Sequence, residues 1–438
     1  MVQQIIFALV TIMAIYWAFR QFSKIQRNLF LGKKKTIDGH ESERWRRVFL
    51  ISFGQIKMFK RWIPALLHFF IYAAFIITQI ELIEILIDGF FGTHRFFANS
   101  LGGFYTFVIS LIELLSVGAF IATIIFLARR NLLKVPRFQK QEMTWWPKLD
   151  ANLILFGEIA LIIGIFCMNG SDIVLQELRP QDYHHTGSFA ISGWLGPMLL
   201  GGIPADWLVF LERFGWWLHI FTVYAFLNYL PASKHLHILF AFPNVYYSRI
   251  DSRGRMENMP EIMNEVKSMM GLAPEGNAEM GEEIPEFGAK DIFDLTWKNI
   301  LDAYTCTECG RCTDVCPANQ TGKKLSPRKI LMDIRDRTEE IGRRLDDKNL
   351  SSHKSYDDGK SLFDYISKEE IHACTTCNAC VEACPVLIDP LDPILKLRRY
   401  EILTLSEGPA DWMPMFTSLE NSGSVWQVPD ERVAWTKS

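Results

Sequence analysis

Five apolar stretches constrain the first half of this sequence more than any other feature. Each is long enough, at about 20 residues, to cross a lipid bilayer as a helix. They lie near residues 4–19, 62–86, 104–127, 151–168 and 207–230. The chain has 438 residues and a net charge of −3, so charge alone indicates no partner. We therefore predict an all-α fold that begins with a five-helix transmembrane bundle.

Basic residues indicate how this bundle is oriented. The loops at about 20–61 and 128–150 are rich in Lys and Arg, whereas the other two loops carry only Arg95 and Arg179. Basic loops stay in the cytoplasm. We therefore expect a multi-pass protein of the inner (cytoplasmic) membrane, with its N-terminus outside and the second half of the chain in the cytoplasm. The first stretch has no basic residue before its apolar core and no obvious cleavage site, so we expect a retained anchor.

Eight of the nine cysteines form two copies of the pattern C-x2-C-x2-C-x3-C-P. The copies are "CTECGRCTDVCP", from Cys306, and "CTTCNACVEACP", from Cys374. In ferredoxins with two clusters, the fourth cysteine of each motif binds the other cluster. We therefore predict two [4Fe–4S] clusters, one on Cys306, Cys309, Cys312 and Cys384, the other on Cys374, Cys377, Cys380 and Cys316. Zinc is disfavoured, because a third close cysteine crowds a tetrahedral site.

Helical patterns surround both cysteine motifs. "SPRKILMDIRDRTEEIGRR" opens with Ser326 as N-cap and Pro327 in the first turn, and "DPILKLRRYEIL" repeats this with Asp392 and Pro393. We predict four regions. They are a membrane domain at 1–245, a linker with one short helix at 246–292, an α-helical ferredoxin domain at 293–405 and a partner-docking tail at 406–438.

Three histidines lie in residues 217–237, "WLHIFTVYAFLNYLPASKHLH", which include the second half of the fifth apolar stretch. On a continuous helix His219 and His237 are five turns apart, on one face and about 27 Å distant, while His235 points elsewhere. Pro231 can kink this helix. A six-coordinate haem iron needs a second imidazole, and His68 lies at the depth of His237. We predict a haem b between His68 and His237. The alternative is that both only form interfacial hydrogen bonds.

The ending "PASKHLH" and the spacing of His219 and His237 resemble the gamma subunit of respiratory nitrate reductase, a five-helix dihaem cytochrome b. This resemblance implies that His237 is a haem ligand. It also implies a second haem at His219, but Thr78 stands where that family has the partner histidine. The remaining candidates for that partner are His94, His184 and His185, each of which is otherwise a solvated loop residue. Whether there are one or two haems stays open.

Four acidic residues fall inside the apolar stretches, where charge is costly. They are Glu81, Glu84, Glu113 and Glu158. Each is expected to face the interior of the bundle. They either exchange protons with a quinone or form hydrogen bonds between helices.

The cysteine-bearing half resembles the α-helical ferredoxin domain found in one component of anaerobic glycerol-3-phosphate dehydrogenases and in heterodisulfide reductases. Together, the two resemblances imply a membrane-bound electron-transfer subunit, as in ETF:quinone oxidoreductases. Electrons would pass between a cytoplasmic partner and the (mena)quinone pool through the clusters and the haem. The expected protein partner is an electron-transfer flavoprotein or a separate cysteine-rich "CCG" chain. The chain is also expected to contact quinone and membrane lipid, and not to bind nucleic acid.

Two alternatives remain for this function. One is a component of a heterodisulfide or sulfur-compound reductase that oxidises quinol. The other is a membrane-anchored iron–sulfur sensor or scaffold, which needs no haem. Nothing in the sequence identifies a catalytic residue, the type of quinone, the direction of electron flow or the oligomeric state.

Overall fold

The computed structural model describes residues 1–252, 254–272, 286–347, 356–425 and 434–436. These residues form helices joined by turns. The one β-type pairing among them is an isolated bridge between Lys33 and Thr296. The all-α fold class is therefore confirmed. The chain forms two compact units: unit 1 holds residues 1–28, 42–246 and 304–310, and unit 2 holds residues 29–41, 247–303 and 311–438.

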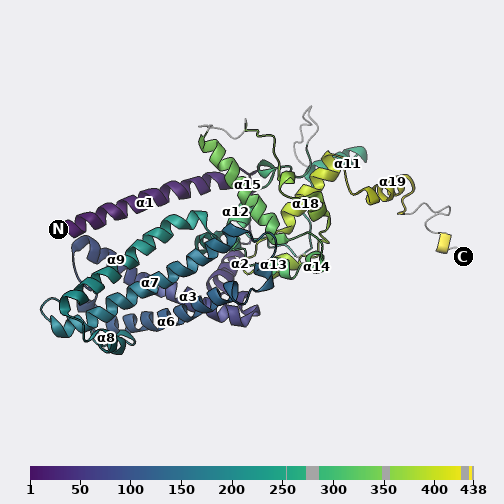
Figure 1. Cartoon of the computed structure of the whole chain (residues 1–438). Helices are drawn as coiled ribbons and strands as arrows, with labels where there is room; N and C mark the ends of the chain where they lie inside the picture. Colours follow the sequence, from purple (N-terminus) through teal and green to yellow (C-terminus); the bar gives the residue numbers. More distant parts are fainter. Residues whose placement is uncertain (253, 273–285, 348–355, 426–433, 437–438) are drawn as a thin grey trace. The chain divides into compact units, whose positions relative to one another are not determined.

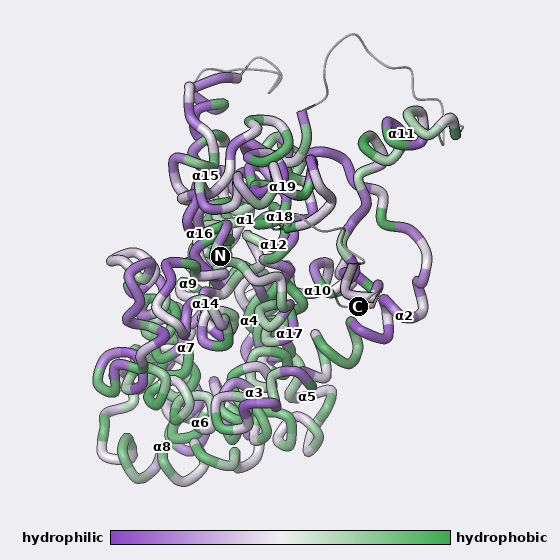
Figure 2. The backbone as a smooth tube through the Cα atoms, turned by 90° about the vertical axis from the view of Figure 1, so that its right-hand side faces the viewer, coloured by the Kyte–Doolittle hydropathy of each residue, from purple (hydrophilic) through white to green (hydrophobic). Residues whose placement is uncertain are grey.

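Four helical segments of the described chain are long and apolar enough to cross a membrane. They are α1 (Val2–Leu29), the consecutive α3 (Trp62–Ile77) and α4 (Gln79–Phe91), α6 (Gly103–Asn131) and α7 (Trp145–Leu178) (Figure 1). In Figure 2 the hydrophobic colour follows α3 and α6 closely. The fifth predicted stretch forms α9 (Ala205–Tyr229), which carries Asp206, Glu212 and Arg213. These helices are compatible with a membrane protein, and the count of five spans stays a prediction.

Shorter helices connect and follow these segments. In the first half of the chain they are α2 (Glu41–Arg47), α5 (Ala98–Leu101), α8 (Ser192–Leu200) and α10 (His237–Tyr246). Later come α11 (Pro260–Met269), α12 (Trp297–Thr305), α13 (Arg311–Asp314), α14 (Pro317–Gln320), α15 (Pro327–Asp347), α16 (Lys368–His372), α17 (Ala379–Ala383), α18 (Leu391–Arg399) and α19 (Met413–Ser422). The short helix expected in the linker is therefore present as α11. Residues 273–285 of that linker lie outside the described residues.

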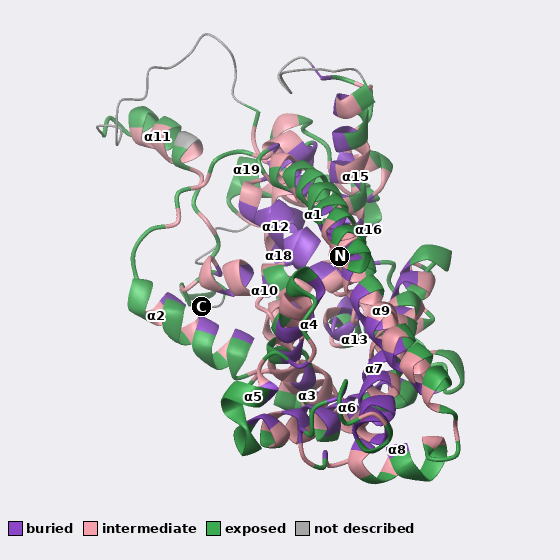
Figure 3. Ribbon diagram, turned by 90° about the vertical axis from the view of Figure 1, so that its left-hand side faces the viewer, coloured by how far each residue is buried: buried purple, intermediate pink, exposed green. Residues whose placement is uncertain are grey.

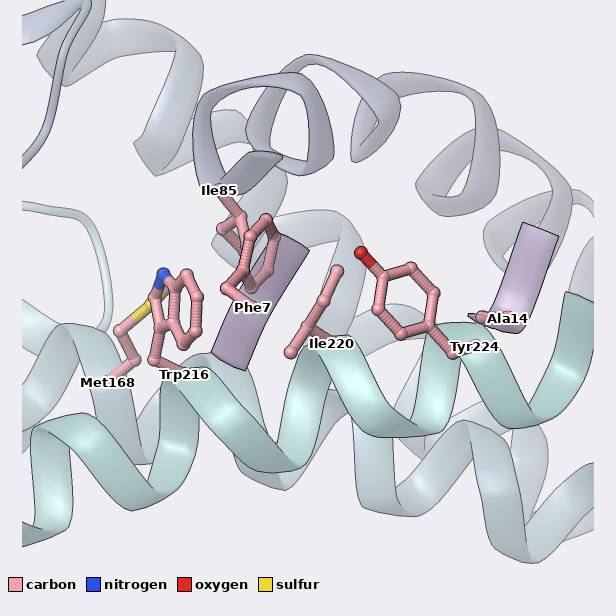
Figure 4. Close-up of a cluster of buried hydrophobic side chains, with 7 residues drawn as sticks. All are labelled: Phe7, Ala14, Ile85, Met168, Trp216, Ile220 and Tyr224. Atoms are coloured by element: carbon pink, nitrogen blue, oxygen red, sulfur yellow. The ribbon is translucent and has the colours of Figure 1, made fainter. Parts of the chain in front are cut away.

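Unit 1 is held together by close packing of α7 against α9. A Cβ added at Gly164 of α7 would lie 3.0 Å from the carbonyl oxygen of Gly215, and one added at Gly215 would lie 2.7 Å from that of Gly164. Small residues let two membrane helices approach this closely. Beside this contact, a buried apolar cluster joins α1, α4, α7 and α9 (Figure 4). Its members are Phe7, Ala14, Ile85, Met168, Trp216, Ile220 and Tyr224.

The chain changes direction directly after α9. Two short 3-10 turns, Leu230–Ala232 and Lys234–Leu236, separate α9 from α10. Pro231 cannot donate a backbone hydrogen bond, which favours a break here. His219 and His237 therefore lie on different helices. The prediction that both lie on one face of a continuous five-turn helix is wrong.

The helix starts of unit 2 were predicted in part. Helix α15 begins at Pro327 as expected, and the Ser326 hydroxyl accepts a hydrogen bond from the Lys329 N–H at 3.4 Å. Helix α18 begins at Leu391, two residues before Pro393, so the prediction of Asp392 as N-cap is wrong. The N-cap position is Pro390, and the carboxylate of the preceding Asp389 accepts hydrogen bonds from the N–H groups of Leu391 at 3.0 Å and Asp392 at 3.2 Å.

A buried arginine of α15 forms ion pairs with other segments of unit 2. Helix α12 of the same unit is also deeply buried (Figure 3). The Arg337 side chain is 1% exposed and donates to Asp291 at 2.7 Å and to Asp358 at 2.8 Å. It also donates to the Lys360 carbonyl at 3.1 Å. Arg337 therefore joins α15 to the chain segments before α12 and after residue 356.

Replacing Arg337 by Ala should destabilise unit 2, because Asp291 and Asp358 would lose their shared cation. Breaking a buried ion pair from one side costs about 3–5 kcal/mol. Urea denaturation of the full chain in micelles, followed by circular dichroism, measures this loss. The exposed Arg343 on the same helix is the control. An Arg337→Ala protein no less stable than Arg343→Ala would contradict the role given to Arg337.

Candidate metal centres

The loops that carry the two cysteine motifs have the same backbone conformation. In each loop the second and fourth residues after the first cysteine adopt the left-handed region, which few residue types favour. They are Glu308 (φ 55°) and Gly310 (φ 72°) in the first loop, and Thr376 (φ 56°) and Asn378 (φ 59°) in the second. A non-glycine residue held in this region costs about 1–3 kcal/mol, and such strain clusters at functional sites.

The shared conformation points backbone N–H groups at cysteine sulfur. The N–H of Glu308 lies 3.4 Å from Cys306 Sγ, and the N–H of Thr376 lies 3.5 Å from Cys374 Sγ. Hydrogen bonds to cysteine sulfur are among the factors that set the potential of an iron–sulfur cluster. The internal repeat predicted from sequence therefore extends to backbone geometry and hydrogen bonding.

The fourth cysteine of each motif leaves its loop in the same way. Cys316 (φ −73°, ψ 118°) and Cys384 (φ −71°, ψ 123°) are both extended and both precede a proline. Cys384 Sγ accepts from the Ile388 N–H at 3.3 Å. In unit 2 the short helices α13 and α17, one from each motif, pack against each other. The backbone therefore has the same extended conformation at the fourth cysteine of both motifs.

The four cysteines of the second predicted set gather within unit 2. Cys316 lies within electrostatic range of Cys374 and Cys380, and Cys377 within range of Cys374. Burial raises the pKa of the Cys374 and Cys380 thiols, and a bound cation would favour their thiolate forms. This grouping is what crossed ligation needs, and the ligand assignment itself stays a prediction.

The other predicted set is divided between the two units. Cys306 and Cys309 belong to unit 1, whereas Cys312 and Cys384 belong to unit 2. No three His, Cys, Asp or Glu side chains in the described parts of the chain lie close enough to hold a single metal ion. A [4Fe–4S] cluster takes its four thiolates on four separate irons. The first set also stays a prediction.

A cluster of three histidines lies in unit 1. His68 comes from α3, His235 from the 3-10 turn and His237 from the start of α10. The rings of His235 and His237 are 6.2 Å apart, and His235 is within electrostatic range of both His237 and His68. The prediction that His235 points elsewhere is wrong, because it assumed that the helix continues past Pro231. His68 and His237, the predicted haem ligands, lie close to the same third imidazole.

The geometry of His237 suits a metal ligand. Its Nδ1 lies 2.9 Å from the Lys234 carbonyl oxygen, so Nδ1 acts as the donor and the lone pair of Nε2 is available. His235 instead has its ring against Phe226, at 5.2 Å, and its Nε2 3.9 Å from Glu158 Oε1. His237 and His68 are therefore the residues that would hold a haem b at this place, and their ligation stays a prediction.

The histidines considered for a second haem have other surroundings. His219 is buried on α9, with Nδ1 3.4 Å from the Leu161 carbonyl oxygen. His94 Nε2 lies 3.1 Å from Asp172 Oδ1. His184 and His185 are exposed. Ligation by His219 stays a prediction, and the structure gives the nitrogen of His94 a carboxylate partner.

One lysine connects the histidine cluster with the first cysteine loop, and all of its contacts lie within unit 1. Lys234 is 8% exposed, and its Nζ donates to Glu308 Oε2 at 2.6 Å and to the Pro147 carbonyl at 2.7 Å. Its Nζ also lies 3.6 Å from Asp150 Oδ2. Glu308 stands between Cys306 and Cys309. Sequence analysis missed Lys234, although its position inside "PASKHLH" was visible.

Comparison with known proteins supports most directly the prediction that the cysteine-rich part binds iron–sulfur clusters. Residues 305–388 match the family model described as 4Fe-4S dicluster domain. The chain is 27% identical to the probable iron-sulfur-binding oxidoreductase FadF of Bacillus subtilis, over 98% of this chain and 60% of that protein. It is 23% identical to the EtfAB:quinone oxidoreductase of Syntrophomonas wolfei, over 87% of this chain and 52% of that protein.

A third relative covers a smaller part of the chain. It is one of the subunits of the ferredoxin:CoB-CoM heterodisulfide reductase of Methanosarcina mazei, 31% identical over 23% of this chain and 48% of that protein. No solved structure matches the chain. This chain is related to iron–sulfur oxidoreductases. It spans between half and about three-fifths of the length of the first two relatives.

Replacing Cys316 by Ser should damage the cluster bound by the second motif, although Cys316 belongs to the first. The reason is that Cys316 lies beside Cys374 and Cys380. EPR spectra of the reduced protein, with iron analysis, measure the loss. The Cys167→Ser variant controls for substitution of a cysteine outside both motifs. Damage confined to the cluster of Cys306, Cys309 and Cys312 would contradict the crossed arrangement.

Replacing Lys234 by Met should lower the reduction potential of the cluster that takes Cys306 and Cys309. A buried positive charge stabilises the reduced, more negative form, so its removal shifts the potential by roughly tens of millivolts. Redox titration monitored by EPR measures the shift. The exposed Lys323 gives a control, Lys323→Met. The double variant K234M/E308Q should move the potential back. Equal potentials in K234M and K323M would contradict this role.

Proposed function

We propose that this chain is a membrane-bound electron-transfer subunit that links a cytoplasmic redox partner to the quinone pool. Electrons would travel through two [4Fe–4S] clusters and a haem b. The observation that carries the proposal is the Lys234–Glu308 contact, because it holds the first cysteine loop beside the histidine turn within one compact unit. Adjacent cofactors are what a relay requires.

The proposed ligands are those predicted from sequence, with His68 and His237 for the haem and four cysteines for each cluster. These groups would supply the one-electron chemistry. The chain itself would orient the ligand side chains and shield the cofactors from solvent. The Lys234 carbonyl fixes the tautomer of His237. Backbone N–H groups donate hydrogen bonds to the Sγ atoms of Cys306 and Cys374. A second haem at His219 is not required by this route.

The proposed electron donor is an electron-transfer flavoprotein, on the basis of the relative named EtfAB:quinone oxidoreductase. The catalytic partner would be a separate chain or a separate domain. The proposed orientation places the basic loops and the cysteine motifs in the cytoplasm, following the positive-inside rule. A heterodisulfide reductase that oxidises quinol is the second candidate, favoured by the relative that belongs to a heterodisulfide reductase.

Replacing His237 by Ala should remove a low-spin haem b spectrum and abolish reduction of a menaquinone analogue by a reduced dye, while the cluster EPR signals persist. His68→Ala should behave in the same way. Optical spectra and a quinone-reduction assay on the purified full chain measure both effects. The exposed His185 provides the matched control, His185→Ala.

Two results would overturn the proposal. A haem spectrum unchanged in both variants would remove the ligand assignment. A wild-type protein with clusters but with neither haem nor quinone turnover would favour the sensor or scaffold alternative. Turnover driven by quinol, with electrons delivered to a disulfide, would favour the heterodisulfide reductase alternative.

A further inference from the structure

A second polar site lies in unit 1, centred on Glu81 in the first turn of α4. Glu81 is 1% exposed, and neither of its carboxyl oxygens has a hydrogen-bond partner in the described residues. It lines a narrow pocket together with Glu84, His94, Arg95 and Glu212. The space in this pocket accepts about one water molecule rather than a ring-shaped ligand.

The other buried carboxyls near Glu81 differ from it, because each has its own donors or cationic partners. Glu84 accepts from the Phe97 N–H at 2.9 Å and the Tyr105 hydroxyl at 2.7 Å. Glu113 accepts from the Ile191 and Ser192 N–H groups at 2.8 and 3.0 Å.

The other two carboxyls have ion-pair partners. Asp172 lies 3.1 Å from His94 and 3.4 Å from Arg95, and Glu212 lies 2.8 Å from Arg213. Among these five carboxyls, Glu81 alone has neither a hydrogen bond nor an ion pair in the described residues.

The charges around Glu81 do not balance if every carboxyl is ionised. Arg95, 5% exposed, directs its guanidinium to Tyr105 at 3.2 Å, Asn169 at 2.6 Å and Asp172 at 3.4 Å rather than to Glu81. Together with Arg213 and His94 it faces five buried carboxyls. A buried carboxylate without donors is costly, whereas a neutral carboxylic acid is much less so. The surroundings of Glu81 therefore favour a bound proton.

A row of carboxyls leads from Glu81 along α4. Glu81, Glu84 and Asp88 are spaced by three and four residues, so they share one face of the helix. Asp88 lies seven positions after Glu81, or about 10 Å farther along the axis. Asp88 is less buried than the other two and accepts from the Thr93 hydroxyl at 2.5 Å and the Arg95 N–H at 2.9 Å. The row ends close to Gly92, where α4 ends.

We propose that Glu81 is a proton-binding site that exchanges its proton, by way of Glu84 and Asp88, with water at the C-terminal end of α4. This inference rests on the proposed function in one respect: the proton is one that quinone chemistry uses. Reduction of a quinone to a quinol takes two electrons from the donor and two protons from water. Glu81 passes its proton to a water molecule, which delivers a proton to the quinone oxygen as the quinol O–H bond forms, and a proton arriving along the row restores the O–H bond of Glu81. Glu81 thus relays protons through water and does not contact the substrate.

Infrared difference spectroscopy of the full chain with its cofactors, in lipid nanodiscs, tests the site directly. The wild-type protein should show a C=O stretching band of a protonated carboxylic acid that shifts in D2O. Glu81→Gln should remove this band, Glu81→Asp should move it, and Glu177→Gln, which alters an exposed glutamate of α7, should leave it unchanged. A band that persists in Glu81→Gln, or its absence from the wild type, would overturn the proposal.

The quinone assay then separates this inference from the proposed function. Glu81→Gln should slow menaquinone-analogue reduction at least about tenfold and change its solvent isotope effect, with cluster and haem spectra intact. Equal rates in Glu81→Gln and Glu177→Gln would refute the relay. A wild-type protein with the infrared band but without quinone turnover would refute the proposed function and leave the proton site standing.

Discussion

The arrangement of the candidate metal centres depends on one buried ammonium group. Lys234 has little access to solvent, so its charge must be balanced inside the protein, and Glu308 and Asp150 supply that balance. Burial lowers the pKa of Lys234, while these two carboxylates act in the opposite direction. The ion pairs fix the position of the segment that carries Cys306 and Cys309 relative to the turn that carries His235 and His237.

The break after α9 makes this arrangement possible. A continuous helix would place His235 and His237 on different faces, whereas the two 3-10 turns bring both imidazoles into one cluster. The same turn directs the Lys234 carbonyl to His237 and its side chain to Glu308. One short irregular segment thus positions groups that belong to two different predicted cofactors.

The sequence predicts those features of this protein that neighbouring residues determine. The cysteine spacing, the Ser326–Pro327 helix start and the apolar stretches follow from neighbouring residues, and the structure agrees with the helix start and with four of the stretches. The position of His235, the start of α18 and the partners of Lys234 depend on where the chain turns or on residues far away in sequence. A helical wheel assumes a straight helix and cannot include Pro231. The missing partner of Glu81 is visible only once all neighbours are in place.

The division of the chain has a practical consequence for anyone who wishes to dissect this protein. Residues 29–41 belong to unit 2 although they follow α1, and residues 304–310 belong to unit 1 although they carry the first two cysteines of the first motif. A fragment that starts at residue 247 would therefore lose the segment that bridges Thr296, and it would expose Glu308 without its lysine. Such a fragment retains all eight cysteines of the two motifs but lacks Lys33 and Lys234, so the motifs and the residues that contact them do not lie in one continuous piece of the chain.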